Sequence, residues 1–213
     1  MKLYFSPLAC SLASRIALYE ARAEATFVEV DLRAKTTSDG QDYLRLNPLG
    51  QVPLLEFEPG ETLSENSAIL QFIAERYPDA GLAPPDARGR ARLQQWLSFI
   101  GTELHKALFN PLLDEKASEA AKAYALDKAA ARLGWLEERL TGREFLLEAF
   151  SVADAYLFAV LNWSAVTPVN LVAWPAIAGY HANLLQRPSV RRAFAEERER
   201  YSHKVARERG AST

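Results

Sequence analysis

The first 77 residues alternate short apolar runs with helical patterns, an order typical of a small α/β domain. Residues 2–5 read as a strand, and from Ser11 onward the apolar residues recur at the spacing of a helix. A second strand is predicted at residues 26–32, where two valines and a leucine alternate onto one face.

A hairpin is predicted in the second half of this segment. Residues 54–57 and 62–64 read as strands, and Pro59-Gly60 between them favours a tight turn. A short irregular or helical piece precedes the hairpin, and a helical pattern follows it over residues 66–77. A β-α-β half followed by a β-β-α half predicts a small mixed sheet covered by helices.

The rest of the chain reads as helical. Residues 78–87 hold three prolines and a glycine and cannot continue a helix. We therefore expect a domain of residues 1–78, a linker of residues 79–87 and an all-helical domain of residues 88–213.

The helices of the second domain differ in apolar content. The first is predicted over residues 87–108, ends before Asn110-Pro111, and carries one apolar stripe: Leu93, Leu97, Ile100, Leu104 and Leu108. Further helices are predicted over residues 117–140 and 180–186. Between them Ser151 and Asp154 form a capping box that opens the most apolar helix, residues 155–160, which is the expected core of this domain. Residues 191–209 carry mixed charge, which favours a solvated segment over a functional one.

Composition narrows the class of protein. A hydrophobic content of 49% is enough for a packed core, and a net charge of -2 provides no basic field to attract nucleic acid or an anionic membrane. A single cysteine excludes an intrachain disulfide and a multi-cysteine metal site, so no metal is expected and a reducing compartment is favoured. Without a signal-peptide pattern or a membrane-length apolar run, the protein is expected to be cytoplasmic.

Three features of the first domain carry chemistry. Cys10 precedes the first helix, where unpaired amides favour a thiolate and make a cysteine reactive. Pro53 opens a strand and has no N–H to donate to the sheet. X-Pro bonds in tight turns can be cis, and such a turn would leave the N–H and C=O of Val52 to pair with an extended peptide. Glu65 stands where the next helix begins, so an ammonium group would meet a carboxylate there.

Each feature also has a simpler interpretation. In the simpler interpretation, Pro59-Gly60 is the turn of an ordinary hairpin, and Glu65 is a carboxylate that is stabilised by the macrodipole of the helix that follows. Most lone cysteines are inert small hydrophobic residues. From the hairpin residues alone, the simpler interpretation is preferred.

Five segments in order carry a resemblance to a known family: KLYFSPLACSLASR, DLRAK, NPLGQVP, SEN and FSVADAYLF. Together they resemble a bacterial glutathione S-transferase of the cysteine-containing beta class, over residues 1 to about 200. The resemblance implies an α/β thioredoxin-like N-terminal domain, which binds glutathione, and an all-α helical C-terminal domain.

The resemblance also implies roles for residues of the first domain. Glu65 would pair with the γ-glutamyl ammonium, while Asn66 and the helix N-terminus would receive the adjacent carboxylate; the family commonly has serine or threonine in place of Asn66. Val52, with Pro53, would take the cysteinyl backbone. Lys35 would hold the glycine carboxylate, although DLRAK alone reads as a surface lysine.

The helix of residues 87–108 adds a second set. Ser98 and His105 lie seven residues apart and so share a helix face. In the resembled class T-E-L-H lies near glutathione, which adds Thr102 and Glu103, and an asparagine is usual at the position of Ser98.

Aromatic residues of the second domain are candidates for the pocket of a second substrate, although such residues on helices are usually core. They are Phe109, Tyr156 and Trp163. His181 and His203 are interpreted as packing or surface residues.

The expected activity is that of a glutathione transferase, with glutathione as co-substrate and no prosthetic group. Its catalytic candidates are Cys10, Ser11 and His105. The thiol of glutathione would attack a small hydrophobic electrophile, and Cys10 would add thiol-disulfide exchange. The resemblance implies a homodimer. A non-catalytic carrier of hydrophobic ligands is the alternative; a regulatory subunit without a glutathione site fits less well, because the glutathione-binding residues are retained.

Overall fold

A computed structural model describes residues 1–210, with side chains described as far as residue 206. The chain divides into two compact units. The first joins Met1–Ala80 to the segment that begins at Pro188, and the second is Gly81–Arg187. The C-terminal segment therefore groups with the sheet-containing unit, whereas the sequence placed it in the helical domain.

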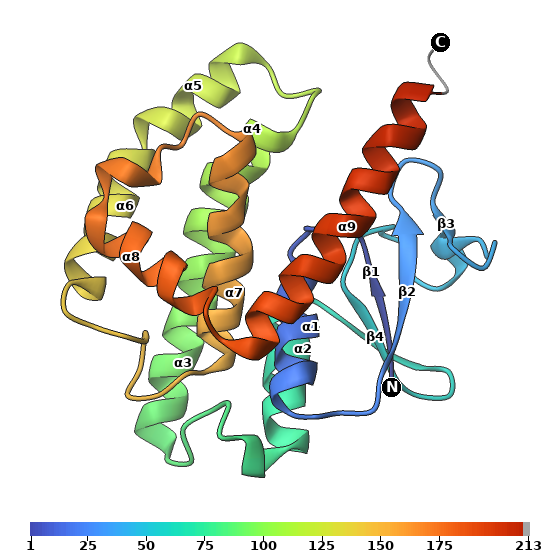
Figure 1. Ribbon diagram of the computed structural model, residues 1–213, viewed down its shortest axis with the longest axis horizontal. Coiled ribbons are helices and arrows are strands. Elements are labelled where there is room, and N and C mark those ends of the chain that lie inside the picture. The colour runs from blue at the N-terminus through green and yellow to red at the C-terminus, as the bar shows by residue number, and fades with distance from the viewer. Residues whose placement is uncertain (211–213) are drawn as a thin grey trace. The chain divides into compact units, whose positions relative to one another are not determined.

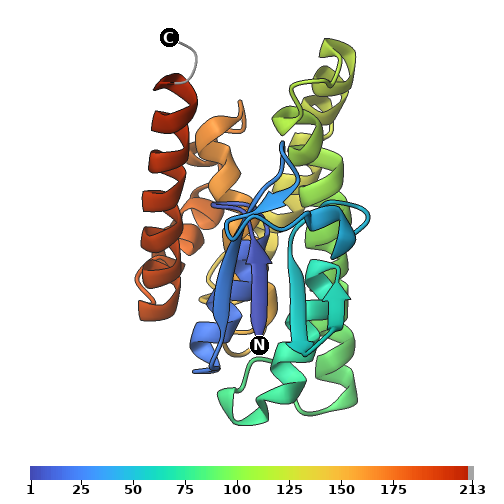
Figure 2. The same ribbon diagram turned by 90° about the vertical axis from the view of Figure 1, so that its right-hand side faces the viewer.

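The first unit is built on a five-stranded mixed sheet in the order β3-β2-β1-β4-β5 (Figures 1 and 2). The strands are β1 (Lys2–Phe5), β2 (Thr26–Asp31), β3 (Thr36–Thr37), β4 (Leu54–Glu58) and β5 (Glu61–Ser64). β1 runs parallel to β2 and antiparallel to β4, and β2–β3 and β4–β5 are antiparallel. The predicted hairpin is confirmed, since Glu58 pairs with Glu61 around Gly60, whose φ is +82°. The two-residue strand β3 was not predicted.

Both faces of the sheet are covered. The helices of this unit are α1 (Ser11–Glu20), α2 (Asn66–Arg76), α9 (Pro188–Gly210) and the short η1 (Tyr43–Arg45) and η2 (Pro78–Ala80). α1 and α2 pack against each other and against the sheet, and α9 packs along α1 (Figure 1). On the other face Tyr43 packs with Tyr4, Val30 and Leu54, and the predicted stripe of β2 joins this cluster. The period of two along the strands thus places one set of side chains under the helices and the other under η1.

The second unit is entirely helical. Its segments are α3 (Ala87–Phe99), η3 (Ile100–Phe109), α4 (Asn110–Leu113), α5 (Glu119–Asp127), α6 (Ala129–Leu140), α7 (Val152–Leu161), η4 (Asn162–Val166), η5 (Leu171–Ala173) and α8 (Pro175–Leu184). Every residue of α7 is buried, so the expected core helix is confirmed. Its capping box is also present: Asp154 accepts from the Ser151 backbone N–H and hydroxyl, both at 2.8 Å.

Two helix predictions, for residues 87–108 and 117–140, were wrong in detail. The first helix does not stop before Asn110-Pro111, because proline is tolerated in the first turn of α4. The helix predicted over residues 117–140 breaks at Lys128 into α5 and α6. The segment Ile100–Phe109 is a π-helix, yet the predicted leucine stripe through it is buried. No helix within residues 1–210 is both long and apolar enough to span a bilayer.

Candidate active site

Cys10 closes the turn between β1 and α1. It is the N-cap residue of α1 and is 8% exposed. Ser11, fully buried beside it, donates its hydroxyl to the Ser6 carbonyl at 3.3 Å and accepts from the Ser6 N–H at 3.4 Å. The predicted helix N-terminus at Cys10 is confirmed, and the Ser11 hydroxyl supports the turn that presents the thiol.

The loop before β4 brings a second backbone segment to the thiol. The Val52-Pro53 peptide bond is cis, and the Cys10 thiol donates to the Val52 carbonyl with the sulfur 3.4 Å from the oxygen. The Tyr43 hydroxyl and the Asn47 amide both donate to the Gln51 carbonyl, at 2.7 and 2.8 Å, and fix the loop. Among residues 1–210 the Val52 N–H has no hydrogen-bond partner, so it remains available to an extended ligand.

Lys35 lies over the same loop. Its side chain is partly buried, and Nζ donates to the Gly50 carbonyl at 2.9 Å. A Cβ on Gly50 would approach the Lys35 side chain to 3.1 Å, and Gly50 has a φ of +60°, so glycine is needed there. Lys35 is therefore a cation held at Gly50 in the loop before β4, in contrast to the solvated lysine that DLRAK alone suggests.

The start of α2 supplies a carboxylate and an amide. Glu65 is the exposed N-cap residue, and Asn66 begins the helix with 6% exposure. The Asn66 Oδ1 accepts from the Ser14 hydroxyl of α1 at 2.9 Å, while its buried Nδ2 has no partner in the described part of the chain. A buried donor without a partner is costly, and a ligand carboxylate would satisfy it. Sequence reasoning missed Ser14, which resembles any other polar position on a buried helix.

Backbone strain concentrates on these residues. Among the described residues, four that are not glycine have a positive φ, and three of them belong to this region: Leu8 at 59°, Lys35 at 57° and Glu65 at 67°. Such conformations cost free energy in residues with a Cβ, and they cluster at functional sites. The first unit therefore combines a thiol, an unpaired backbone N–H, a cation and a carboxylate on strained loops around one sheet.

The helical unit brings four predicted residues together. The His105 Nδ1 lies 2.8 Å from the Tyr156 hydroxyl oxygen, and the His105 ring packs edge-on against Trp163 with centroids 4.8 Å apart. Phe109 meets Trp163 at 5.9 Å. Phe109 is fully buried and Tyr156 is 3% exposed, so both rings contribute to the core of this unit.

Of the remaining candidates of the helical unit, Ser98 and Thr102 are exposed and Glu103 is partly buried. Thr102 donates to the Ser98 carbonyl at 2.9 Å, and the Ser98 hydroxyl accepts from Gln94 at 3.2 Å. Glu103 pairs with Arg132 of α6 at 2.9 Å. The π-helical geometry begins between Ser98 and His105, so the α-helical spacing used to place them on one face does not apply across this segment.

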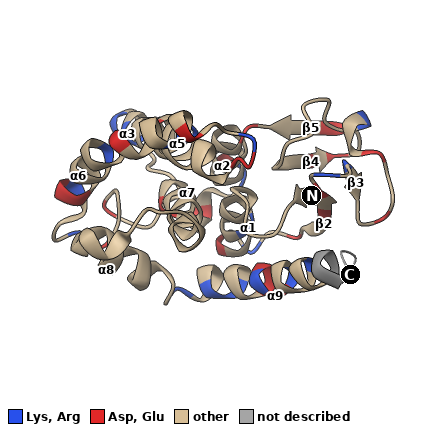
Figure 3. Ribbon diagram, turned by 90° about the horizontal axis from the view of Figure 1, so that it is seen from above, with Lys and Arg blue, Asp and Glu red and all other residues tan. Residues whose placement is uncertain are grey.

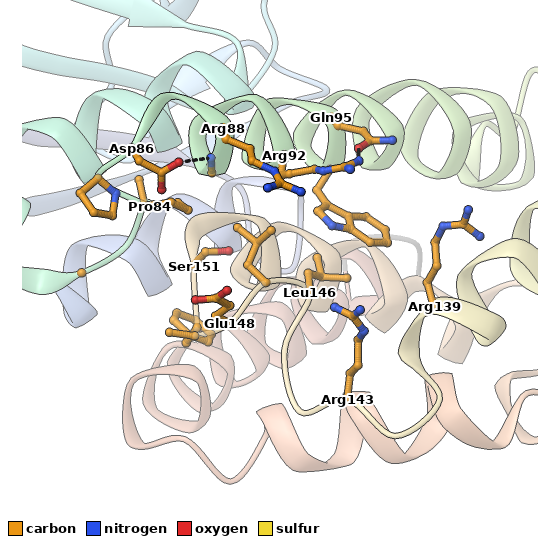
Figure 4. Close-up of a pocket in the computed structure, with 18 of the residues that line it drawn as sticks. Pro84, Asp86, Arg88, Arg92, Gln95, Arg139, Arg143, Leu146, Glu148 and Ser151 are labelled. Atoms are coloured by element: carbon orange, nitrogen blue, oxygen red, sulfur yellow. Dashed lines mark hydrogen bonds between the residues drawn. The ribbon is translucent and has the colours of Figure 1, made fainter.

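A cavity of about 870 Å³ also lies in the helical unit, away from the predicted residues (Figure 4). Arg88 and Arg92 of α3 line one side, and Arg139 and Arg143 line another. All four arginines are exposed, and none of the candidate site residues contributes to the lining. We assign this cavity no part in the reaction. Within residues 1–210 there is also no group of three or more His, Cys, Asp or Glu side chains suited to a metal ion.

Burial keeps His105 neutral. Burial, with a smaller contribution from the charge of Lys106, lowers the pKa of His105 to about 4. In the unfolded chain the histidine pKa is near 6.5, so the unfolded chain takes up the proton first as the pH falls. Protonation of His105 therefore lowers the free energy of unfolding progressively as the pH falls from about 6.5 to about 4.

We expect the stability cost of His105 to appear on mild acidification. Between about pH 7 and pH 5 the wild type should lose up to about 2 kcal/mol more unfolding free energy than His105→Gln. Urea denaturation of both proteins at the two pH values measures the difference. Equal losses would contradict the buried, neutral state of His105.

Comparison with known protein families identifies the family of this chain. Residues 1–75 match the glutathione S-transferase N-terminal domain, and residues 96–188 match the glutathione S-transferase C-terminal domain. The chain belongs to the glutathione S-transferase family.

Individual relatives of this family agree along nearly the whole chain. Glutathione S-transferase GstA of Escherichia coli O157:H7 is 39% identical over 199 residues, which covers 92% of this chain and 98% of the relative. A sphingomonad glutathione S-transferase solved in complex with glutathione is 45% identical, with a TM-score of 0.88 over 92% of this chain and 98% of its own. A bacterial beta class glutathione S-transferase from Sphingomonas chungbukensis gives the same identity, TM-score and coverage. The fold expected from the sequence, a thioredoxin-like unit followed by a helical one, is thereby confirmed as the glutathione S-transferase fold.

Proposed function

We infer that this chain is a glutathione transferase that activates the thiol of glutathione for attack on a small hydrophobic electrophile. The observation that carries the inference is the combination, in the first unit, of an unpaired Val52 N–H with a buried, unpartnered Asn66 amide. Glutathione offers both partners that these groups lack, because it has an extended peptide backbone and a terminal carboxylate. Glutathione is the co-substrate, and no prosthetic group enters the proposal.

Each end of glutathione then has a candidate partner. Glu65 receives the γ-glutamyl ammonium, and Asn66 with the N-terminus of α2 receives the neighbouring carboxylate. Val52, held by the Pro53 turn, pairs with the cysteinyl residue. Lys35 holds the glycine carboxylate and exchanges its bond to Gly50 for one to the ligand.

Activation of the thiol rests on the turn at Cys10. Donors at the start of α1 stabilise a sulfur anion and therefore favour attack by the glutathione thiolate. In this proposal Ser11 acts through the turn that it ties together, and Cys10 steadies the substrate sulfur. We propose that the protein is of the beta class, as the position of Cys10 and the likeness to the Sphingomonas chungbukensis enzyme suggest.

The helical unit supplies the remaining roles. We propose that His105, Tyr156 and Trp163 form the polar and aromatic wall against which the electrophile binds, with Phe109 packed behind Trp163. Ser98, Thr102 and Glu103 are retained from the family resemblance as candidates for binding glutathione, with Glu103 oriented by Arg132.

Thiol-disulfide exchange through Cys10 is a second activity of the same site. The Cys10 thiolate attacks one sulfur of oxidised glutathione, a protein-glutathione disulfide forms, and one reduced glutathione leaves with the electron pair of the broken bond. We expect wild-type protein incubated with oxidised glutathione near pH 7 to gain one glutathione by intact mass, and Cys10→Ala to gain none. Conjugation by Cys10→Ala should fall less than its thiol-transferase activity. A wild-type protein that never forms the adduct would reduce Cys10 to a packing residue.

The assembly is proposed to be a two-fold symmetric homodimer in the cytoplasm, where a single cysteine stays reduced. Sedimentation equilibrium should give about twice the chain mass of 23.7 kDa. A monomer that still turns over substrate would contradict the dimer. A non-catalytic carrier of hydrophobic ligands with this fold remains the second candidate, and turnover separates the two.

A further inference from the structure

The C-terminal helix α9 carries a fully buried carboxylate. The sequence favours a solvated segment for residues 191–209, and charged residues of both signs are distributed along α9 (Figure 3). Yet Glu197 is 0% exposed, and Val190 and Ala193 one or two turns earlier are buried with it. A carboxylate is almost never fully buried unless specific partners compensate its desolvation.

One partner of Glu197 is a buried guanidinium on α1. Arg15 is 2% exposed and lies between the rings of Phe5 and Phe27, at 4.2 and 4.1 Å from their centroids. Its Nε lies 3.0 Å from the Glu197 Oε1, an ion pair without hydrogen-bond geometry. Its NH1 donates to Glu196 at 2.9 Å. These contacts explain why α9 is fixed along α1.

The other partner of Glu197 is the turn that presents the thiol. The Leu8 N–H donates to the Glu197 Oε2 at 2.8 Å. Leu8 has a φ of 59°, a strained conformation for a leucine, and it stands two residues before Cys10. A charge-assisted bond to a fixed carboxylate is a strong way to hold such a backbone. Glu197 therefore joins α9, the buried arginine of α1 and the strained turn.

We propose that Glu197 is a positioning residue for Cys10: its carboxylate, fixed by Arg15, holds the Leu8 N–H and so sets the conformation of the turn that presents the thiol at the start of α1. Burial raises the pKa of Glu197 to about 7, and Arg15 and the Leu8 N–H oppose that rise, as they would for a carboxylate held between them. The assignment rests on the proposed function only in the role given to Cys10.

The reactivity of Cys10 tests this role directly. Cys10 is the only cysteine in the chain, so the rate of alkylation by iodoacetamide, followed by intact mass, reports on this thiol alone. For Glu197→Ala we expect the midpoint of the rate-pH profile to rise by about one unit, because the loosened turn no longer fixes the amides at the start of α1 around the sulfur. Glu197→Gln keeps an oxygen that can accept from Leu8, so its midpoint should lie closer to that of the wild type.

A matched control separates positioning from general stability. Glu196→Gln weakens the neighbouring pair to Arg15 on the same helix but touches no atom of the turn, and its profile should coincide with that of the wild type. Urea denaturation checks that each variant is folded under the assay conditions. If Glu197→Ala is not folded, the proposal is tested by comparing the rate-pH midpoint of Glu197→Gln with that of Glu196→Gln. A shift confined to the Glu197 variants supports the proposal. Unshifted Glu197 variants, or an equal shift in Glu196→Gln, would overturn it. The readout needs no glutathione, so failure of the proposed transferase activity would leave this result unaffected.

Discussion

Replacing Asp154 by alanine is expected to lower the free energy of unfolding by about 4 kcal/mol or more. The Asp154 side chain is fully buried and accepts four hydrogen bonds. Two come from Ser151, one from the Leu146 N–H at 2.8 Å and one from the Tyr180 hydroxyl at 2.6 Å. Alanine leaves four buried donors unsatisfied, each of which costs about 1–3 kcal/mol. Urea denaturation at neutral pH measures the difference.

The control for Asp154 is another acidic cap in the same unit. Asp86 is the exposed N-cap residue of α3 and accepts from the Gly89 N–H at 2.9 Å. Asp86→Ala should cost about 1 kcal/mol, as ordinary helix caps do. Losses of the same size in both variants would show that the network around Asp154 adds nothing beyond a cap.

Replacing Glu65 by glutamine is expected to weaken glutathione binding by about 10- to 100-fold. The change preserves the shape of the side chain but removes the charge that would meet the γ-glutamyl ammonium, and hydrogen bonds to charged groups contribute about 1.5–3 kcal/mol. Lys35→Ala should weaken binding less, by at most about fivefold, because a partly exposed ion pair contributes about 1 kcal/mol or less. Calorimetric titration with glutathione measures both losses.

Glu61 offers a matched control on the same hairpin. It is exposed on β5 and pairs with Glu58 across the turn. Glu61→Gln removes the same charge from the same unit and should leave the affinity for glutathione unchanged. A similar loss in Glu61→Gln and Glu65→Gln would assign the effect to net charge and contradict a specific ammonium site.

Elements governed by local pattern could be predicted from the sequence. The hairpin at Pro59-Gly60, the leucine stripe of α3 and η3, and the capping box at Ser151 each depend on residues a few positions apart. The grouping of α9 with the first unit could not be predicted from the sequence, because it depends on partners about 180 residues away in the chain. A glutamate that meets Arg15 reads, from sequence, like its solvated neighbours.

The candidate site shows the same division. Cys10, Val52 and Glu65 stand beside Pro53 or a helix start, signals that a sequence displays. The Ser14 bond to Asn66 and the Lys35 bond to Gly50 join separate elements and appear only in the fold. The change to π-helical geometry at Ile100 has no sequence signal that we recognise, and it alters which residues of that helix share a face.

Steady-state turnover tests the central claim most directly. The purified protein would be assayed with glutathione and a panel of small electrophiles: an aryl halide, an epoxide, an α,β-unsaturated carbonyl and an organic hydroperoxide. We expect at least one to be consumed at a rate that saturates with glutathione, and Glu65→Gln to require a higher glutathione concentration for half saturation. Protein that binds glutathione by calorimetry yet leaves every electrophile at its uncatalysed rate would contradict the transferase and favour the carrier.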